Sequence, residues 1–365
     1  MTENPGFFLY ILAFLLVIGP LVFVHELGHY AAGRLFGIKA DAFSIGFGRE
    51  IAGFTDKRGT RWKFGWLPLG GYVKFAGDMN PASQPSSDWL SLPAAERAQT
   101  FQAKPVWQRA IVVAAGPVTN FIVAIAILGA FAAIYGEAKV PAIAGSVQAG
   151  MPAEAAGLKT GDRFVSIGGR EIETFDDMYA FTTLRAGMKV RIDYVRDGQP
   201  GSTEVVIGRV VQKDRFGNEM SRGILGIGPP PRETFVHTPV AWWQAPAAGF
   251  NRTVSLVGTM IDGLSQLVMG RVPVSELGGP LRIAKYSGET LSLGWDKLVV
   301  LAALVSINLG FINLLPVPVL DGGHLLFYAI EAVRRKPVGP EVMEWAFRGG
   351  MVAILALMLL VTFND

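Results

Sequence analysis

Hydrophobic residues gather in four long blocks, at about 6–36, 106–135, 298–330 and 345–363. A helix needs about 20 apolar residues to cross the hydrocarbon core of a bilayer, and each block is about that long or longer. The pattern therefore predicts a mainly α-helical polytopic membrane protein with four transmembrane helices. No basic segment precedes the first block, so we expect it to be retained rather than cleaved as a signal peptide.

The segment between the first two blocks, residues 37–105, predicts β-structure. Between 43 and 75, aromatic or aliphatic residues alternate with small or polar ones, and Asp56 to Gly59 between two such runs is typical of a turn. We expect a membrane-associated β-hairpin region whose glycine-rich edge could pair with an extended peptide. An ordinary cytoplasmic hairpin fits the pattern equally well. Residues 79–104 are polar and are expected to form a connecting loop.

Residues 138–230 predict an inserted α+β domain, because short alternating runs and turn signals follow one another closely. Residues 231–297 continue as an amphipathic helical region. The tryptophans Trp242 and Trp243 near its start favour a helix at the membrane interface. The expected order is thus an N-terminal membrane part (1–136), the inserted domain, the interfacial region and a C-terminal membrane part (298–365).

The distribution of charge predicts an orientation. The chain carries a net charge of +3, and Lys and Arg are in excess in residues 37–106 and 331–348. The positive-inside rule places both segments in the cytoplasm, with both termini and the inserted domain outside. The basic loops are expected to face anionic membrane lipids. No basic cluster is interleaved with aromatic residues, so no nucleic-acid partner is expected.

The first hydrophobic block contains the pentapeptide HELGH at residues 25–29. An acidic residue at the centre of a spanning helix costs about 2.5–3.5 kcal/mol, so ionisable groups there are functional candidates. On a helix, His25 and His29 lie about 40° apart in projection, where both can bind one metal ion. Glu26 lies between them, within reach of a water at the metal. A chance match in an ordinary helix is the alternative, and the placement favours the metal site.

The third block is interrupted where it carries an aspartate. Pro316 and Pro318 remove backbone donors just before Asp321, so a continuous helix is not expected. Irregular backbone at membrane depth is tolerated where it is buried in protein or lines a water-filled cavity. A structural kink is the alternative, although a kink requires no aspartate. His25 and Asp321 both lie about twenty residues into blocks that run from outside to inside, which predicts one shared site at one depth. Cysteine is absent, so a metal there must use His and carboxylate ligands.

Four segments together resemble the site-2 protease family of intramembrane zinc metalloproteases (peptidase family M50). The closest resemblance is to its bacterial RseP-type members, which carry a PDZ domain. The segments are HELGH at 25–29, GGYVK at 70–74, GPVTN at 116–120 and NLLPVPVLDG at 313–322, in the family's order and over nearly the whole chain. HExxH alone occurs in many soluble proteases, whereas its pairing with NxxPxPxLDG in a later hydrophobic block is specific.

The resemblance implies roles for individual residues. His25, His29 and Asp321 are expected to bind one Zn²⁺, with Glu26 as general base. His324 is expected to support the site or to be structural rather than a ligand. The residues expected to hold the substrate backbone are Asn313, Asn308, Gly70, Gly71 and Tyr72.

Two other motifs have less specific expectations. Asn120, in the GPVTN segment, is expected to pack the first two helices together. The inserted domain resembles a single PDZ module, whereas some RseP-type proteins carry two. Its carboxylate-binding loop is expected at Ile224, Leu225, Gly226 and Ile227, where a plain core strand fits equally well.

The implied function is site-2 cleavage of single-pass membrane proteins such as anti-sigma factors, and of remnant signal peptides, in the bacterial inner membrane. A site-1 protease would first trim the substrate, and the PDZ domain would restrict access by size. The alternative is a membrane-anchored PDZ adaptor or chaperone with a structural metal. A transporter is a weaker alternative, because transporters usually show paired broken helices and only the third block is broken here.

Overall fold

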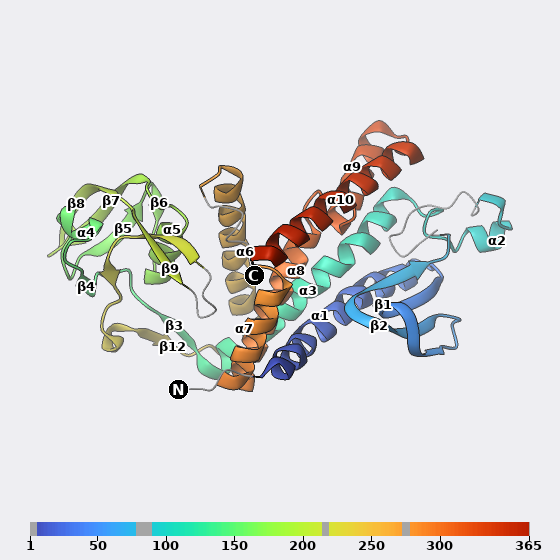
Figure 1. Cartoon of the computed structure of the whole chain (residues 1–365), viewed down its shortest axis with the longest axis horizontal. Coiled ribbons are helices and arrows are strands. Elements are labelled where there is room, and N and C mark those ends of the chain that lie inside the picture. Colours follow the sequence, from blue (N-terminus) through green and yellow to red (C-terminus); the bar gives the residue numbers. More distant parts are fainter. Residues whose placement is uncertain (1–5, 78–89, 214–218, 272–277, 365) are drawn as a thin grey trace. The chain divides into compact units, whose positions relative to one another are not determined.

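The structure, a computed structural model, describes residues 6–77, 90–213, 219–271 and 278–364. Its contacts divide the chain into two compact units. We call residues 1–128 with 279–362 the helical unit, and residues 129–278 with 363–365 the mixed unit. Figure 1 shows the helices and strands that make up each unit.

Within the described residues, four helices are long and apolar enough to cross a membrane. Large apolar side chains on them remain exposed, including Phe8, Ile122 and Leu359, as expected of helices that lipid surrounds. The chain is therefore a mainly helical membrane protein, as the hydrophobic blocks predicted. The four helices are α1 (Phe7–Leu35), α3 (Val106–Tyr135), α8 (Trp295–Asn313) and α10 (Pro340–Asn364).

The third hydrophobic block forms two helices instead of one. α8 ends at Asn313, and α9 (Asp321–Arg334) begins after an irregular segment, 314–320. Pro316 and Pro318 have no N–H to continue the helix, and Val319 has a positive φ of 89°, which non-glycine residues rarely adopt. The predicted interruption is present. Because of it, the membrane-spanning helix α8 ends at Asn313, whereas the hydrophobic block extends over 298–330.

The expected interfacial region, 231–297, contains two long helices that belong to different units. α6 (Ala245–Val268) is part of the mixed unit, whereas α7 (Pro280–Leu293) is part of the helical unit. α7 packs closely along α1, where a methyl group on Gly288 would lie 3.1 Å from the Tyr10 Cα. The second of these helices therefore supports the membrane helices directly.

The strands β1 (Ala40–Thr55) and β2 (Arg61–Phe75) form an antiparallel sheet. Both are long, and residues 42–45 of β1 pair with 61–64 of β2 as well as with 71–74. Residues 70–75 therefore form an edge of the sheet. Of the loop expected over 79–104, residues 79–89 lie outside the described part, and the rest contains the short helix α2 (Ala94–Arg97).

The turn of this hairpin is organised by Asp56. Its carboxylate accepts hydrogen bonds from Trp62 Nε1 at 3.0 Å and from the backbone N–H groups of Arg58 and Thr60. These bonds, that from Trp62 above all, hold the pKa of Asp56 below its usual value. The turn predicted from Asp56 to Gly59 therefore has a specific cause.

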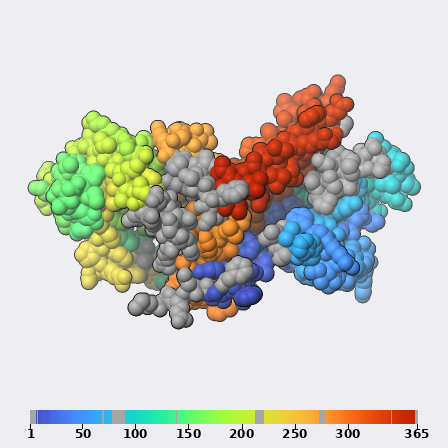
Figure 2. Space-filling view, viewed as in Figure 1, coloured from blue at the N-terminus to red at the C-terminus, as the bar shows by residue number. Residues whose placement is uncertain are grey.

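The outer part of the hairpin is apolar and open. Ile51, Phe54 and Trp66 are 71%, 60% and 63% exposed, and Figure 2 shows the hairpin, in blue, as an open surface of the helical unit. Large exposed apolar side chains of this kind are typical of surfaces that contact a membrane or a partner.

The mixed unit is built on a four-stranded antiparallel sheet in the order β6-β5-β7-β8. α5 (Phe175–Thr183) begins with a capping box between Thr174 and Asp177. Phe164, Ile167 and Ile192 are almost wholly buried in the core of the unit. The sheet strands are β5 (Arg163–Ile167), β6 (Arg170–Glu171), β7 (Lys189–Arg196) and β8 (Gln199–Val206).

Three further strand pairs complete the mixed unit: two of them join segments far apart in the sequence, and the third is a hairpin. The α+β character expected of the inserted segment is therefore present, and the unit also contains the short helix α4 (Pro152–Ala155). The pairs are β4 (Ser146–Val147) with β11 (Ile227–Gly228), β9 (Gly208–Lys213) with β10 (Glu219–Ile224), and β3 (Glu137–Lys139) with β12 (Val236–Thr238).

α6 is attached to the rest of the mixed unit through Asp262. The carboxylate accepts hydrogen bonds from the buried Arg185, which also donates to the Phe181 carbonyl at 3.0 Å, and from Gln266 at 3.3 Å. Burial alone would raise the pKa of Asp262, but the hydrogen bond and charge of Arg185 outweigh it and hold the pKa below its usual value.

We expect Asp262→Ala to loosen α6, because it leaves the Arg185 guanidinium buried without its carboxylate. The local stability should fall by about 1–3 kcal/mol, measured as faster amide hydrogen exchange along α6. Because folding lowers the pKa of Asp262, wild type should keep this contribution at neutral pH and lose it only as the pH falls through the acidic range. Glu173→Ala, an exposed position of the same unit, is the control. Equal exchange in both variants would contradict this role.

Candidate metal centre

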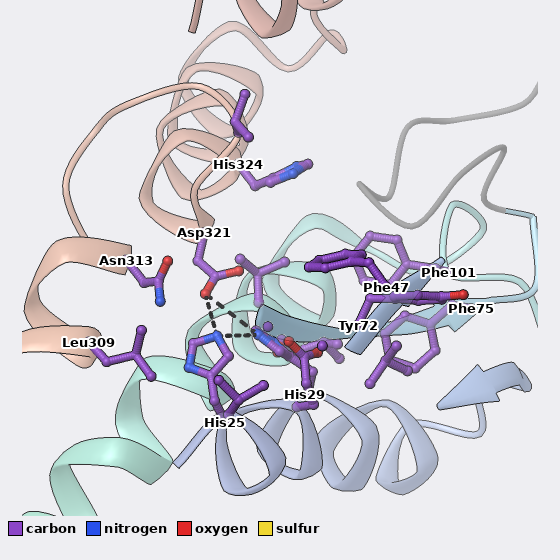
Figure 3. A pocket seen from close by; sticks show the side chains of 18 of the residues that line it. His25, His29, Phe47, Tyr72, Phe75, Phe101, Leu309, Asn313, Asp321 and His324 are labelled. Atoms are coloured by element: carbon purple, nitrogen blue, oxygen red, sulfur yellow. Dashed lines mark hydrogen bonds and ion pairs between the residues drawn. The ribbon is translucent and has the colours of Figure 1, made fainter. Parts of the chain in front are cut away.

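Two imidazoles from α1 meet at the centre of the helical unit. His25 and His29 are one helical turn apart, and their Nε2 atoms lie 3.2 Å from each other. The rings stand nearly perpendicular, at 82° with centroids 4.8 Å apart. Both point away from the axis of α1 into the same space (Figure 3).

Asp321 completes this group from the first turn of α9. Its Oδ2 lies 3.2 Å from His25 Nε2 and 3.5 Å from His29 Nε2. Figure 3 shows the carboxylate reaching the two rings from the opposite side of the cavity. The irregular segment 314–320 thus has a consequence for the site, because it starts a new helix with this carboxylate at its N-terminus.

The three side chains fit a metal ion. Within the described part of the chain, Asp321 Oδ2 is buried and has no hydrogen-bond partner, although two imidazole nitrogens face it. One ligand atom from each residue lies within 4.8 Å of the others. Zinc binds nitrogen and oxygen ligands at about 2.0–2.1 Å, so tetrahedral ligands are separated by about 3.3 Å, close to the separations here. The donor set of two imidazoles and a carboxylate also suits Zn²⁺.

The helix α3 lies directly behind both imidazoles. His29 Nδ1 donates to the Val112 carbonyl at 2.9 Å, and His25 Nδ1 lies 3.1 Å from the Asn120 amide nitrogen. Gly116 permits this approach, since a methyl group there would lie within 3.0 Å of the His29 ring. The GPVTN segment indicated from the sequence that this helix belongs to the family pattern. It did not predict these contacts, because they depend on how α1 and α3 face each other.

Glu26 faces the sheet edge formed by residues 70–75. A methyl group on Gly71 would lie 3.0 Å from the Glu26 Cγ. The glycine therefore lets the edge strand approach the carboxylate closely. This arrangement places Glu26 between the imidazoles and the strand.

A cavity of about 530 Å³ opens around the three ligand atoms and Glu26. The Asn313 side chain points into it from the end of α8, and Phe47, Phe75 and Phe101 form an aromatic part farther from the metal centre (Figure 3). Asn308, which immediately precedes Leu309 on the same helix, is not among the described residues that line the cavity. Of the residues expected to hold substrate, those on this cavity are Asn313, Gly70, Gly71 and Tyr72.

His324 lines the same cavity but lies apart from the three ligand atoms. Its ring packs 5.0 Å from the Phe347 ring and 6.4 Å from that of Tyr328, and Figure 3 shows it directed away from Asp321. Among the described residues, the cluster able to hold a metal consists of His25, His29 and Asp321.

The expected carboxylate-binding loop lies in the mixed unit. Ile224, Leu225, Gly226 and Ile227 line a separate cavity of about 250 Å³, together with Arg222 and part of α5. Leu225 is also part of the buried core, and Gly226 has a positive φ of 79°. Leu225 therefore belongs to the core, and the segment as a whole also lines the cavity.

Two histidines lie one turn apart on a membrane helix, with a glutamate between them in the sequence. An aspartate from a distant part of the sequence lies beside them in space. This arrangement defines a class of membrane metallopeptidase. The sequence profile of peptidase family M50 matches residues 13–357, and the chain belongs to this family. The protein is accordingly a zinc metalloprotease with membrane-protein substrates.

The chain is similar to curated bacterial proteins along almost its full length. "Putative zinc metalloprotease Atu1380" of Agrobacterium fabrum is 45% identical, with 98% of this chain and 95% of that protein covered. "Putative zinc metalloprotease R01501" of Rhizobium meliloti is 42% identical, with 96% and 95% covered. "Metalloprotease MmpA" of Caulobacter vibrioides is 35% identical, with 99% and 96% covered.

Proposed function

We propose that the protein is an intramembrane endopeptidase that cleaves other membrane proteins at or near their spanning helices. One zinc ion would be held by His25, His29 and Asp321, with Glu26 as the general base. The observation that carries this proposal is the convergence of the three ligand atoms, from residues far apart in the sequence, beside a glutamate and a cavity.

Glu26 performs the proton transfers of the proposed hydrolysis. Zinc, when bound, supplies a Lewis acid that activates water and polarises the scissile carbonyl. The Glu26 carboxylate accepts the proton of the attacking water and delivers it to the leaving amine. Glu26 lines the cavity beside the edge strand, where a methyl group on Gly71 would lie 3.0 Å from its Cγ.

The substrate backbone is proposed to extend along the edge strand 70–75. A helical substrate hides its carbonyl groups in i to i−4 hydrogen bonds, so it must unwind before a peptide bond can react. Gly70, Gly71 and Tyr72 lie on an edge of the sheet and line the cavity, where backbone pairing could replace the lost bonds. Asn313 would hold the chain from the opposite side.

We expect Asn313→Ala to lower kcat/KM about 10- to 100-fold, since losing one hydrogen bond to the substrate backbone costs about 1–3 kcal/mol. The measurement is cleavage of a spanning-helix substrate by the detergent-purified enzyme. Asn308→Ala is the matched control, because Asn308 lies on the same helix but not on the cavity. Equal effects of the two substitutions would exclude the proposed contact.

We further propose an orientation in the bacterial inner membrane. The basic segments 37–106 and 331–348 would be cytoplasmic, and the mixed unit and termini periplasmic. His25 lies about 27 Å along α1 from Phe7, which supports a site near the cytoplasmic side. The exposed apolar residues of the hairpin and of α6 are consistent with contact with lipids.

The finer biological role is proposed on the resemblance of the motifs. The enzyme would perform site-2 cleavage of substrates of the anti-sigma factor type, and of remnant signal peptides, after a site-1 protease has trimmed them. The mixed unit would act as a PDZ domain that restricts access by size. The groove at Ile224, Leu225, Gly226 and Ile227 supports a second role in binding peptide ends.

Cleavage of a reconstituted substrate tests the proposed function. Purified wild-type enzyme in liposomes should cut a single-pass protein within its spanning helix, and a zinc chelator should abolish the cut. The alternative, an adaptor or chaperone with a structural metal, predicts binding of the same protein with no zinc-dependent product. Intact substrate after prolonged incubation with the zinc-loaded enzyme would favour that alternative.

A further inference from the structure

Asn120 occupies an unusual position behind the metal centre. It is fully buried on α3, and its amide nitrogen lies 3.1 Å from His25 Nδ1. The amide oxygen is also buried and has no hydrogen-bond partner among the residues that the structure describes. A buried polar atom without a partner costs about 1–3 kcal/mol, so this arrangement needs an explanation beyond packing.

The atoms that face the two Nδ1 nitrogens determine which ring nitrogen of each imidazole carries the proton. His29 Nδ1 faces the Val112 carbonyl, which can only accept a hydrogen bond, so its proton sits on Nδ1 and its Nε2 is free. His25 must reach the same tautomer to offer Nε2 to a metal, because a neutral imidazole carries one proton. Its Nδ1–H then needs an acceptor, and an amide nitrogen cannot accept.

A half-turn of the Asn120 amide gives His25 the acceptor that it needs. Oxygen and nitrogen exchange places in such a rotation with no change in shape. The oxygen then accepts the His25 Nδ1 proton, and the amide nitrogen takes the position that has no partner among the described residues. The Ser306 hydroxyl, from α8, donates to the Asn120 backbone carbonyl at 2.8 Å, which holds this turn of α3 in place.

We propose that Asn120 is a positioning residue for zinc: its amide oxygen accepts the Nδ1 proton of His25 and so keeps Nε2 free for the metal. The role rests on the proposed zinc site. It differs from the packing role that the sequence predicted, because it depends on a hydrogen-bond acceptor rather than on the size of the side chain.

Asn120→Leu and Asn120→Asp separate the two roles, since Leu and Asp are both similar to Asn in size. An acceptor role predicts that Leu weakens zinc affinity about 10- to 100-fold, while Asp, a stronger acceptor, stays within about 3-fold of wild type. A packing role predicts that the buried charge of Asp is at least as harmful as Leu.

The experiment measures zinc affinity by chelator competition on the detergent-purified full chain, and records the absorption spectrum of the cobalt-substituted protein. Thr119→Val is the matched control, because the Thr119 hydroxyl donates to the Ala115 carbonyl of its own helix, at 2.6 Å. We expect wild-type affinity for Thr119→Val and an altered cobalt spectrum for Asn120→Leu. Should Asn120→Leu fail to fold, Asn120→Ala must show the same loss of affinity.

The inference would be overturned if Asn120→Leu or Asn120→Ala bound zinc as tightly as wild type. Equal losses of zinc affinity in Asn120→Leu and Asn120→Asp would overturn it as well. Neither result would contradict the zinc site itself. A wild-type protein that binds no zinc, or a His25→Ala variant that binds it as tightly as wild type, would overturn the proposed site itself. The two failures are therefore distinguishable.

Discussion

Glu26→Gln is expected to lower the rate of peptide cleavage by about 10²–10⁴-fold, the usual contribution of a general base. The amide has nearly the shape of the carboxylate but cannot accept a proton from water. The substituted side chain is not one of the three proposed ligands, so the protein should still bind one zinc. The measurement is single-turnover cleavage of a spanning-helix substrate together with the zinc content of the same sample.

The control for this variant is Glu341→Gln, a change of the same kind in the first turn of α10. It should cleave at the wild-type rate. A Glu26→Gln enzyme that retains more than a tenth of the wild-type rate would contradict the assignment of Glu26. Loss of zinc along with activity would instead show that Glu26 supports the metal.

Asp321→Asn is expected to remove both bound zinc and activity. In the wild-type protein, the buried Asp321 Oδ2 is the one negatively charged atom of the three proposed ligand atoms. A neutral amide is a weak zinc ligand, so we expect zinc content to fall from about one per chain to less than about a tenth after dialysis. Elemental analysis of the purified protein measures it.

His324→Ala provides the matched control, because His324 lies one turn along α9 and lines the same cavity. Its ring packs against Phe347, so the variant should keep zinc even if it loses some stability. Loss of zinc in His324→Ala with retention in Asp321→Asn would reverse the assignment of the ligand.

The parts of the site that were predictable from the sequence are those with local causes. His25 and His29 share a helix face because they are four residues apart, a relation that needs no tertiary structure. Asp321 could be placed near them because hydrophobic block lengths predict depth. The prolines before it predicted the break that lets α9 begin at this carboxylate.

Other features depend on how elements face each other, which periodicity does not record. The contacts of Val112 and Asn120 with the imidazoles require the rotation of α3 relative to α1. Likewise, alternation predicted strands over 43–75 but not the double pairing of residues 42–45, which makes 70–75 an edge. The assignment of α6 and α7 to different units also depends on tertiary packing, so periodicity could not predict it.

Zinc-edge X-ray absorption on the wild-type full chain, loaded with one equivalent of zinc, tests the central claim most directly. The account predicts nitrogen and oxygen neighbours at about 2.0–2.1 Å with the outer-shell scattering of two imidazoles, reduced to one in His25→Ala. A spectrum with no imidazole scattering, or one unchanged by His25→Ala, would contradict it.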